Sequence, residues 1–184
     1  EVGGLFVLDC IASGAIWVDM LHTAVDVLIS APQKGWSGSP CAALVMMSDR
    51  ARKRIDDTTS NSFACDLAKW LWIMETYEKG GHAYHATMPT DGLVTFSHMM
   101  NEMKKIGFDT VYHRQQELGD RVRSLLAMKG FKSVAADGYG APGVVVCYTD
   151  DPAIQNGSKF AELGLQIAAG VPLQCGEPDG FSTF

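Results

Sequence analysis

Two charged residues stand where apolar runs end, and they carry different chemistry. Lys34 follows the run Val25–Ile29, in a turn of Gly, Ser and Pro, and Asp9 closes the run Gly4–Leu8. Open α/β sheets place their sites at strand ends, and a glycine such as Gly35 lets a ligand approach the backbone. A lysine desolvated in such a place loses basicity and becomes a nucleophile suited to Schiff-base chemistry.

Each of these residues also has a purely structural interpretation. Lys34 could be a solvated lysine in a surface turn. An Asp at the end of a buried strand is costly unless it is paired or hydrogen bonded. Asp9 could meet that need as the N-cap of the following segment, or by holding a cation, which would be Lys34 or a protonated ligand nitrogen. The residues alone leave these alternatives open.

A third group of polar side chains lies in the loop from Tyr84 to Pro89. Tyr84, His85 and Thr87 bring two hydroxyls and an imidazole within four residues, and such donors could hold a phosphate. The segment Gly138–Gly143 fits the glycine pattern of dinucleotide-binding loops. It precedes a strand instead of following one, however, so we interpret it as a turn.

The composition excludes several classes of function. The chain has 184 residues, is 47% apolar and carries a net charge of −6, so it offers no basic stripe to nucleic-acid phosphates. No apolar run approaches the roughly 20 residues that cross a membrane as a helix. We therefore expect neither nucleic acid nor a membrane as a partner. The five cysteines form no C-x-x-C pair, which predicts no metal site and favours a reducing, cytoplasmic compartment.

The hydrophobic pattern predicts an α/β part followed by a smaller α+β part. The apolar runs predict buried strands, the first of them covered on both faces as in a parallel sheet. Helical spacing predicts amphipathic helices. Arg50–Arg54 reads as the solvated face of a helix after a capping Ser48. The predicted strands are Gly4–Leu8, Val25–Ser30, Cys41–Met47, Phe131–Ala135, Gly143–Tyr148 and Phe181–Phe184. The predicted helices cover about Asp66–Tyr77, Leu93–Ile106, Thr110–Met128 and Ser158–Leu163.

Three motifs in order resemble the class V pyridoxal-phosphate aminotransferases, and most of all their alanine–glyoxylate and serine–glyoxylate branch. They are Asp9-Cys10-Ile11-Ala12-Ser13, then Ser30-Ala31-Pro32-Gln33-Lys34, then Tyr84-His85-Ala86-Thr87-Met88-Pro89. The likeness runs through essentially the whole chain. It implies a fold-type I transferase: residues 1–98 would be the C-terminal half of the large domain that binds the cofactor, with a mixed, mainly parallel sheet. Residues 99–184 would be the small, incomplete C-terminal α+β domain.

The resemblance also implies a role for each site residue. Lys34 would bind pyridoxal 5'-phosphate covalently and then act as acid and base in the proton shift, while Asp9 would pair with the ring nitrogen. Ile11 would pack on one face of the ring, and Gln33 would lie beside its 3-hydroxyl or phosphate. A Tyr and a Thr of the partner subunit reach the phosphate in this family, and they match Tyr84 and Thr87. The resemblance therefore implies a homodimer with shared active sites.

The departures from the family pattern limit what this chain could do alone. The first cofactor-binding loop and the aromatic residue that stacks on the other ring face lie upstream of anything present. The arginine that binds the substrate carboxylate has no match here. We therefore expect a fragment with little activity of its own, from an aminotransferase acting on a small amino acid, such as alanine or serine, and a 2-oxo acid, such as glyoxylate or pyruvate.

Two alternatives stay open beside the aminotransferase. One is a class V lyase or desulfurase on the same fold, although desulfurases usually carry His before the lysine, where this chain has Gln33. The other is a non-catalytic dimerisation or binding fragment, against which the presence of both Lys34 and Asp9 speaks.

Overall fold

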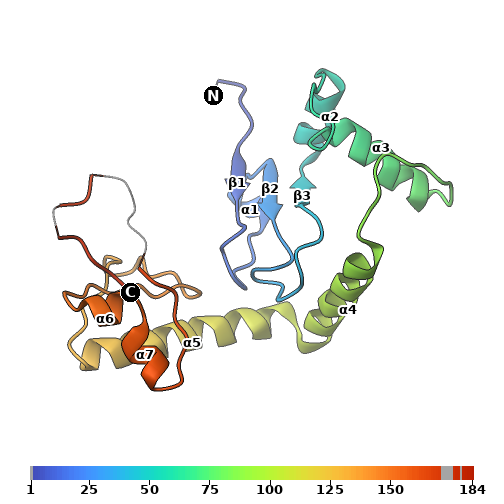
Figure 1. Cartoon of the computed structure of the whole chain (residues 1–184). Coiled ribbons are helices and arrows are strands. Elements are labelled where there is room, and N and C mark those ends of the chain that lie inside the picture. Colours follow the sequence, from blue (N-terminus) through green and yellow to red (C-terminus); the bar gives the residue numbers. More distant parts are fainter. Residues whose placement is uncertain (1, 171–175, 179) are drawn as a thin grey trace. The chain divides into compact units, whose positions relative to one another are not determined.

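The computed structural model describes residues 2–170, 176–178 and 180–184, and the chain divides into two compact units (Figure 1). The first unit is Glu1–Phe108 and the second is Asp109–Phe184. In chain order the elements are β1 (Val7–Asp9), α1 (Met20–Thr23), β2 (Val27–Ser30), β3 (Leu44–Met47), α2 (Asp49–Asp56), α3 (Leu67–Glu78), α4 (Thr90–Ile106), α5 (Phe108–Met128), α6 (Pro152–Gln155) and α7 (Ser158–Glu162).

A small mixed sheet lies at the centre of the first unit. β1 and β2 are parallel, with Asp9 opposite Ile29, and β2 and β3 are antiparallel, with Ser30 opposite Leu44. The end of β1, the end of β2 and the start of β3 therefore lie at one end of the sheet. The turn that carries Lys34 joins β2 to β3 at that end. The predicted fold class, an α/β sheet of mixed direction followed by an α+β part, is confirmed.

A small buried cluster packs at this sheet. Cys10, Val25 and Leu28 are buried together, with Leu8, Val18 and Met20 packed against them. The prediction that both faces of the first strand are covered is wrong for the described residues, because Phe6 and Val7 are about half exposed, at 49% and 52%. β1 pairs with β2 alone and lies at the edge of the sheet, where fewer neighbours cover its side chains.

Side-chain caps fix where the next helices begin. Ser48 accepts a hydrogen bond from the Ala51 amide at the start of α2, and Asp66 accepts one from Lys69 at the start of α3, as N-caps do. α4 ends at Gly107, whose φ of 93° lies in the region that glycine reaches without strain. None of the described helices is long and apolar enough to cross a membrane.

The second unit contains less regular structure than predicted. In place of the strands predicted in 131–135, 143–148 and 181–184, the described residues form two isolated bridges, Ser133 with Cys147 and Tyr148 with Thr183. The three segments do pair, because the amide of Val134 donates to the carbonyl of Val146 and that of Cys147 to the carbonyl of Phe184. Turns at Gly138 and at Pro142 interrupt the pairing before a strand can extend, since proline has no amide to donate.

The division into compact units falls after Phe108, within the first turn of α5. The predicted division, 1–98 and 99–184, follows the expected domains of an aminotransferase and not compactness, so it stays a prediction.

Candidate active site

The turn that carries Lys34 is held by its own backbone. The Gly38 amide donates to the Pro32 carbonyl at 2.8 Å, and the Ser37 amide donates to the Lys34 carbonyl at 2.9 Å. Pro32 is fully buried beneath the turn, whereas the side chains of Gln33 and Lys34 are exposed. The described residues therefore present the amine of Lys34 to solvent, and the expected desolvation of this lysine is not seen.

Asp9 lies at the neighbouring strand end and is exposed as well. Its Oδ1 accepts a hydrogen bond from the Ile11 amide at 2.9 Å, and the Cys10 amide ties the strand end to the Ile29 carbonyl at 2.8 Å. No helix begins here, so the carboxylate closes a tight turn instead of capping a helix. Within the described residues its other oxygen, Oδ2, has no hydrogen-bond partner, and Asp9 forms no ion pair with Lys34.

Backbone packing joins the loop after Asp9 to the turn after Lys34. A methyl group built on Gly35 would stand 1.9 Å from the carbonyl oxygen of Gly14, so only glycine fits at this position. Trp17 and Trp36 continue the contact, with ring centroids 4.9 Å apart. The two loops that carry the candidate amine and carboxylate therefore behave as one packed layer at the end of the sheet.

Two further aromatic rings support this layer from α4 and the start of α5. Phe96, which is only 4% exposed, meets Trp36 edge to face at 5.8 Å. Phe108 lies against Trp17 at 5.4 Å, and its carbonyl accepts a hydrogen bond from the Trp17 Nε1 at 3.0 Å. Aromatic pairs in this geometry are each favourable beyond the area they bury. We conclude that the turn after Lys34 rests on a rigid base.

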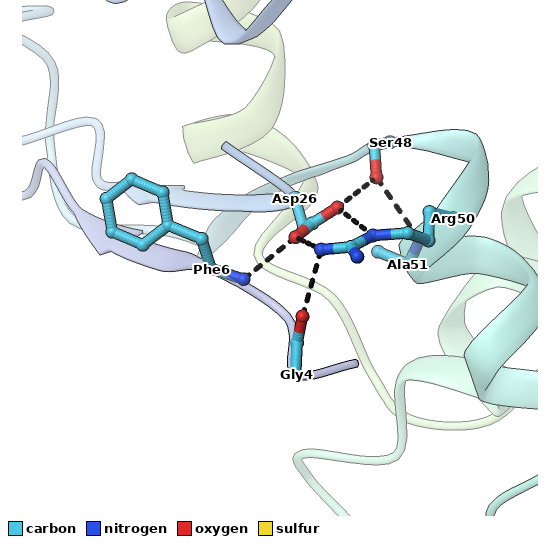
Figure 2. A network of polar contacts seen from close by, with 6 residues as sticks. All are labelled: Gly4, Phe6, Asp26, Ser48, Arg50 and Ala51. Carbon is cyan, nitrogen blue, oxygen red and sulfur yellow. Dashed lines mark hydrogen bonds and ion pairs between the residues drawn. The ribbon is translucent and has the colours of Figure 1, made fainter. Parts of the chain in front are cut away.

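A buried carboxylate fixes the three strands at their other end, as Figure 2 shows. Asp26, which is 5% exposed, pairs with the Arg50 guanidinium and accepts hydrogen bonds from the Phe6 amide at 2.8 Å and the Ser48 hydroxyl at 3.1 Å. Hydrogen bonds from Arg50 and then from Phe6 lower the pKa of Asp26 well below its ordinary value. The network links β1, β2 and the start of α2, so it sets the register on which the strand ends depend.

The hydroxyls of Tyr84 and Thr87 lie side by side in the loop between α3 and α4. Tyr84 Oη and Thr87 Oγ1 are 3.0 Å apart, and both side chains are exposed. His85, between them in sequence, instead binds the Phe63 carbonyl through Nε2 at 2.9 Å. In the described residues no hydrogen bond or ion pair joins the hydroxyl pair to Lys34 or Asp9. The chain thus offers two separate groups of polar side chains.

The supporting residues were mostly missed from the sequence. The tryptophans carry no spacing signal, because Trp17 and Trp36 lie in irregular segments. The interpretation of Arg50–Arg54 as a solvated face is confirmed, because these basic side chains are exposed, but it missed that exposed Arg50 also pairs with buried Asp26. A signal for that pair was present, because a carboxylate inside the apolar run Val25–Ile29 requires a buried partner.

Solved structures define the class of fold. An alanine–glyoxylate aminotransferase from Nostoc sp. matches 98% of this chain with a TM-score of 0.77 and 19% identity. An aspartate aminotransferase from Thermus thermophilus matches 98% with a TM-score of 0.78 and 20% identity. A cysteine desulfurase from Thermococcus onnurineus matches less well, with a TM-score of 0.59 over 88% of the chain at 15% identity. The chain has the fold of the alanine–glyoxylate and related aminotransferases, which confirms the predicted resemblance.

Two known proteins are similar to the chain in sequence. Alanine–glyoxylate aminotransferase 1 of Saccharomyces cerevisiae is 27% identical over 158 residues, and the soluble hydrogenase small subunit of a Synechococcus strain is 25% identical over 141. No family model matches the chain. The matches span 40% and 35% of these two relatives, and 48% of each of the two aminotransferase structures. The chain therefore corresponds to half or less of these proteins.

Proposed function

We propose that this chain is part of an aminotransferase that uses pyridoxal 5'-phosphate and moves an amino group from a small amino acid to a 2-oxo acid. The observation that carries the proposal is that an exposed amine, Lys34, and an exposed carboxylate, Asp9, lie on two loops packed together at one end of the sheet. The shared fold with alanine–glyoxylate aminotransferase supports it. The substrates that the sequence suggests are alanine or serine as donor and glyoxylate or pyruvate as acceptor.

The polar groups present fit the chemistry of this cofactor. Pyridoxal phosphate, when bound, supplies an aldehyde that takes up an amine and a ring that withdraws electrons. Lys34 offers the amine, and Asp9 offers a carboxylate oxygen, Oδ2, that no described group occupies. A carboxylate beside a ring nitrogen favours its protonated form. The hydroxyls of Tyr84 and Thr87 are donors suited to a phosphate.

Each residue then has one task. Lys34 would hold the cofactor and carry a proton between two positions of the substrate, as a positioned lysine can do in general acid–base catalysis. Asp9 would keep the ring nitrogen protonated, Ile11 would cover one ring face, and Gln33 would bind a polar substituent. Because of the resemblance to this family, we assign the Tyr84–Thr87 pair to the site of a second copy, in a homodimer with shared sites.

A titration with pyridoxal phosphate tests the proposal. We expect a visible absorbance band on binding, and borohydride reduction should attach the cofactor irreversibly to the peptide that contains Lys34. Lys34→Ala should abolish both signals, whereas Lys104→Ala, an exposed lysine on α4, should change neither. Asp9→Asn should weaken binding and shift the band while keeping the attachment. Attachment at other lysines with Lys34 untouched would contradict the proposal.

Two measurements, attachment of the cofactor and release of sulfur, separate the alternative functions. A dimerisation or binding fragment without catalytic chemistry would show no attachment at Lys34. A desulfurase would release sulfur from cysteine in the full-length protein, which an aminotransferase would not do. The poorer match to the desulfurase structure and the presence of Gln33 before the lysine favour the aminotransferase. We expect the isolated chain to transaminate poorly, because no arginine matches the one that binds the substrate carboxylate.

The cysteines of the described residues are reduced, and this supports a proposal for the cellular compartment of the protein. The described cysteines, Cys10, Cys41, Cys65 and Cys147, are free thiols, and Cys175 lies outside the described residues. Free thiols persist in reducing compartments, so we propose a cytoplasmic protein.

A further inference from the structure

The loop that carries Tyr84 and Thr87 has little backbone support of its own. At the start of the loop the Gly81 amide donates to the Thr76 carbonyl at 2.9 Å. At its end the Thr90 amide donates to the Met88 carbonyl. In the described part of the chain, no backbone amide between these two donates to a backbone carbonyl. Two hydroxyls that are to bind one phosphate need a fixed separation. Because backbone hydrogen bonds do not fix this loop, contacts of its side chains with other segments must order it.

His85 supplies that order through its contacts with segments outside the loop. Its Nε2 donates to the Phe63 carbonyl at 2.9 Å, because a carbonyl can only accept. Its ring lies on the Phe63 ring at 4.2 Å and meets the Trp70 ring edge to face at 5.0 Å. One side chain therefore makes a polar contact and two aromatic contacts with segments outside its own loop.

The partners of His85 are themselves anchored to α3. Trp70 lies within α3, and its Nε1 donates to the Ala64 carbonyl at 2.8 Å. This bond ties the segment of Phe63 and Ala64 to the helix, so the carbonyl that receives His85 is fixed. α3 therefore holds Trp70, Trp70 holds the segment of Phe63, and this segment holds His85. His85 in turn restrains the residues on either side of it.

We propose that His85 is a positioning residue, which holds the loop so that the hydroxyls of Tyr84 and Thr87, hydrogen bonded to each other at 3.0 Å, lie together where one phosphate can bind. The inference rests on the proposed function, since it presumes that this pair binds the phosphate of pyridoxal phosphate. Both the neutral Nε2–H tautomer and the imidazolium donate through Nε2. The hold on the loop therefore does not depend on the charge of His85.

Binding of pyridoxal phosphate compared with pyridoxal, which lacks the phosphate, measures what the hydroxyl pair contributes. We expect the wild-type protein to prefer the phosphorylated form. Tyr84→Phe and Thr87→Ala should each reduce that preference, and His85→Ala should reduce it by about three- to tenfold, the range of one net hydrogen bond. Affinity for pyridoxal should stay unchanged in all three variants.

Two conservative variants separate positioning from general folding. His85→Gln keeps a donor near the position of Nε2 and should restore most of the preference. His85→Phe keeps the aromatic contacts without the donor and should not restore it, although its melting temperature should stay close to that of the wild type. A merely structural role of His85 would not make the two variants differ in their preference for the phosphate while the melting temperature of His85→Phe stays close to that of the wild type.

The outcomes distinguish the inference from the function on which it rests. Equal binding of pyridoxal phosphate and pyridoxal by the wild type would overturn the phosphate site, and the inference with it. A preference that Tyr84→Phe reduces but His85→Ala does not would overturn the role of His85 alone. Failure of His85→Gln to restore the preference would overturn the role of its hydrogen bond.

Discussion

Gly35 lies against the backbone of Gly14, so the turn after Lys34 and the loop after Asp9 can pack together only if position 35 carries no side chain. The Cβ of any other residue at position 35 would lie 1.9 Å from the Gly14 oxygen and 2.4 Å from its carbonyl carbon. These atoms belong to the main chain and cannot rotate away. The closeness of the two candidate site loops depends on this contact and on the contact of Trp17 with Trp36.

Replacement of Gly35 by Ala should therefore separate the two loops. We expect a loss of about 1–3 kcal/mol in the free energy of unfolding, as for other overpacked sites, together with weaker binding of pyridoxal phosphate. Denaturant unfolding and a cofactor titration measure the two effects. Gly4→Ala is the matched control, because its nearest neighbour, Val2 Cγ2, would lie at an ordinary 3.9 Å. Equal stability of the two variants would contradict the prediction.

Asp26 should make the stability of the first unit depend on pH. Its pKa is lowered in the folded chain, first by the hydrogen bond from Arg50. It therefore contributes stability above the unfolded value of about 3.9, and that contribution is lost as the pH falls towards the folded pKa.

We expect Asp26→Asn to lower the melting temperature at neutral pH, and the difference from wild type to shrink steadily below about pH 4. Asp57→Asn, an exposed position at the end of α2, should show little difference at either pH. Melting temperatures measured by circular dichroism across this range check the prediction. A difference that stays constant into acid would show that the pair with Arg50 is not its source.

Trp17→Phe should isolate the hydrogen bond to the Phe108 carbonyl from the ring contacts around it. The Phe ring can still pack against Trp36, but it cannot donate. We expect a loss of about 0.5–1.5 kcal/mol in the free energy of unfolding, the usual net value of such a bond. Denaturant titration measures it, with Trp72→Phe, a half-exposed position on α3, as control.

The described cysteines should differ widely in reactivity. Burial raises the pKa of the Cys10 thiol, helped by the nearby charge of Asp9, and burial also raises the pKa of Cys147. A raised pKa leaves less thiolate at neutral pH, and the thiolate is the form that reacts. Exposed Cys65 should react with iodoacetamide at least about tenfold faster than either, as measured by mass spectrometry of the labelled peptides. In denaturant the rates should converge, and fast labelling of Cys10 in the folded chain would contradict the prediction.

Local signals predicted much of the fold. The cap at Ser48 and the apolar spacing of α3, α4 and α5 depend on neighbours close in sequence, and those elements occur within a few residues of their predicted bounds. Segments 131–135, 143–148 and 181–184 were predicted as strands by their apolar composition alone. The turns between these segments limit their pairing. The composition of a segment does not indicate where a turn ends the hydrogen bonding between two strands.

In the candidate site, too, the features that depend on neighbours in sequence were predicted, whereas the contacts between residues far apart in sequence were not. Lys34 and Asp9 were singled out because each follows an apolar run, and the parallel pairing of β1 with β2 brings those ends to one side. The contacts that hold them, Gly14 with Gly35 and Trp36 with Phe96, join positions about 20 to 60 residues apart. A single sequence carries no signal for such pairs, since many glycines and aromatic residues would satisfy it equally.

The antiparallel pairing of β2 with β3 has a consequence for how the lysine turn can change. Ser30 and Leu44 face each other across the sheet, so residues 31–43 form a closed loop whose two stems are adjacent. Lengthening such a loop costs little free energy, because closure entropy grows only slowly with length. A one-residue slip of β3 would, by contrast, turn every β3 side chain to the other face. The segment that bears Lys34 can therefore vary in length, provided that β2 and β3 keep their register and Gly35 keeps its contact with Gly14.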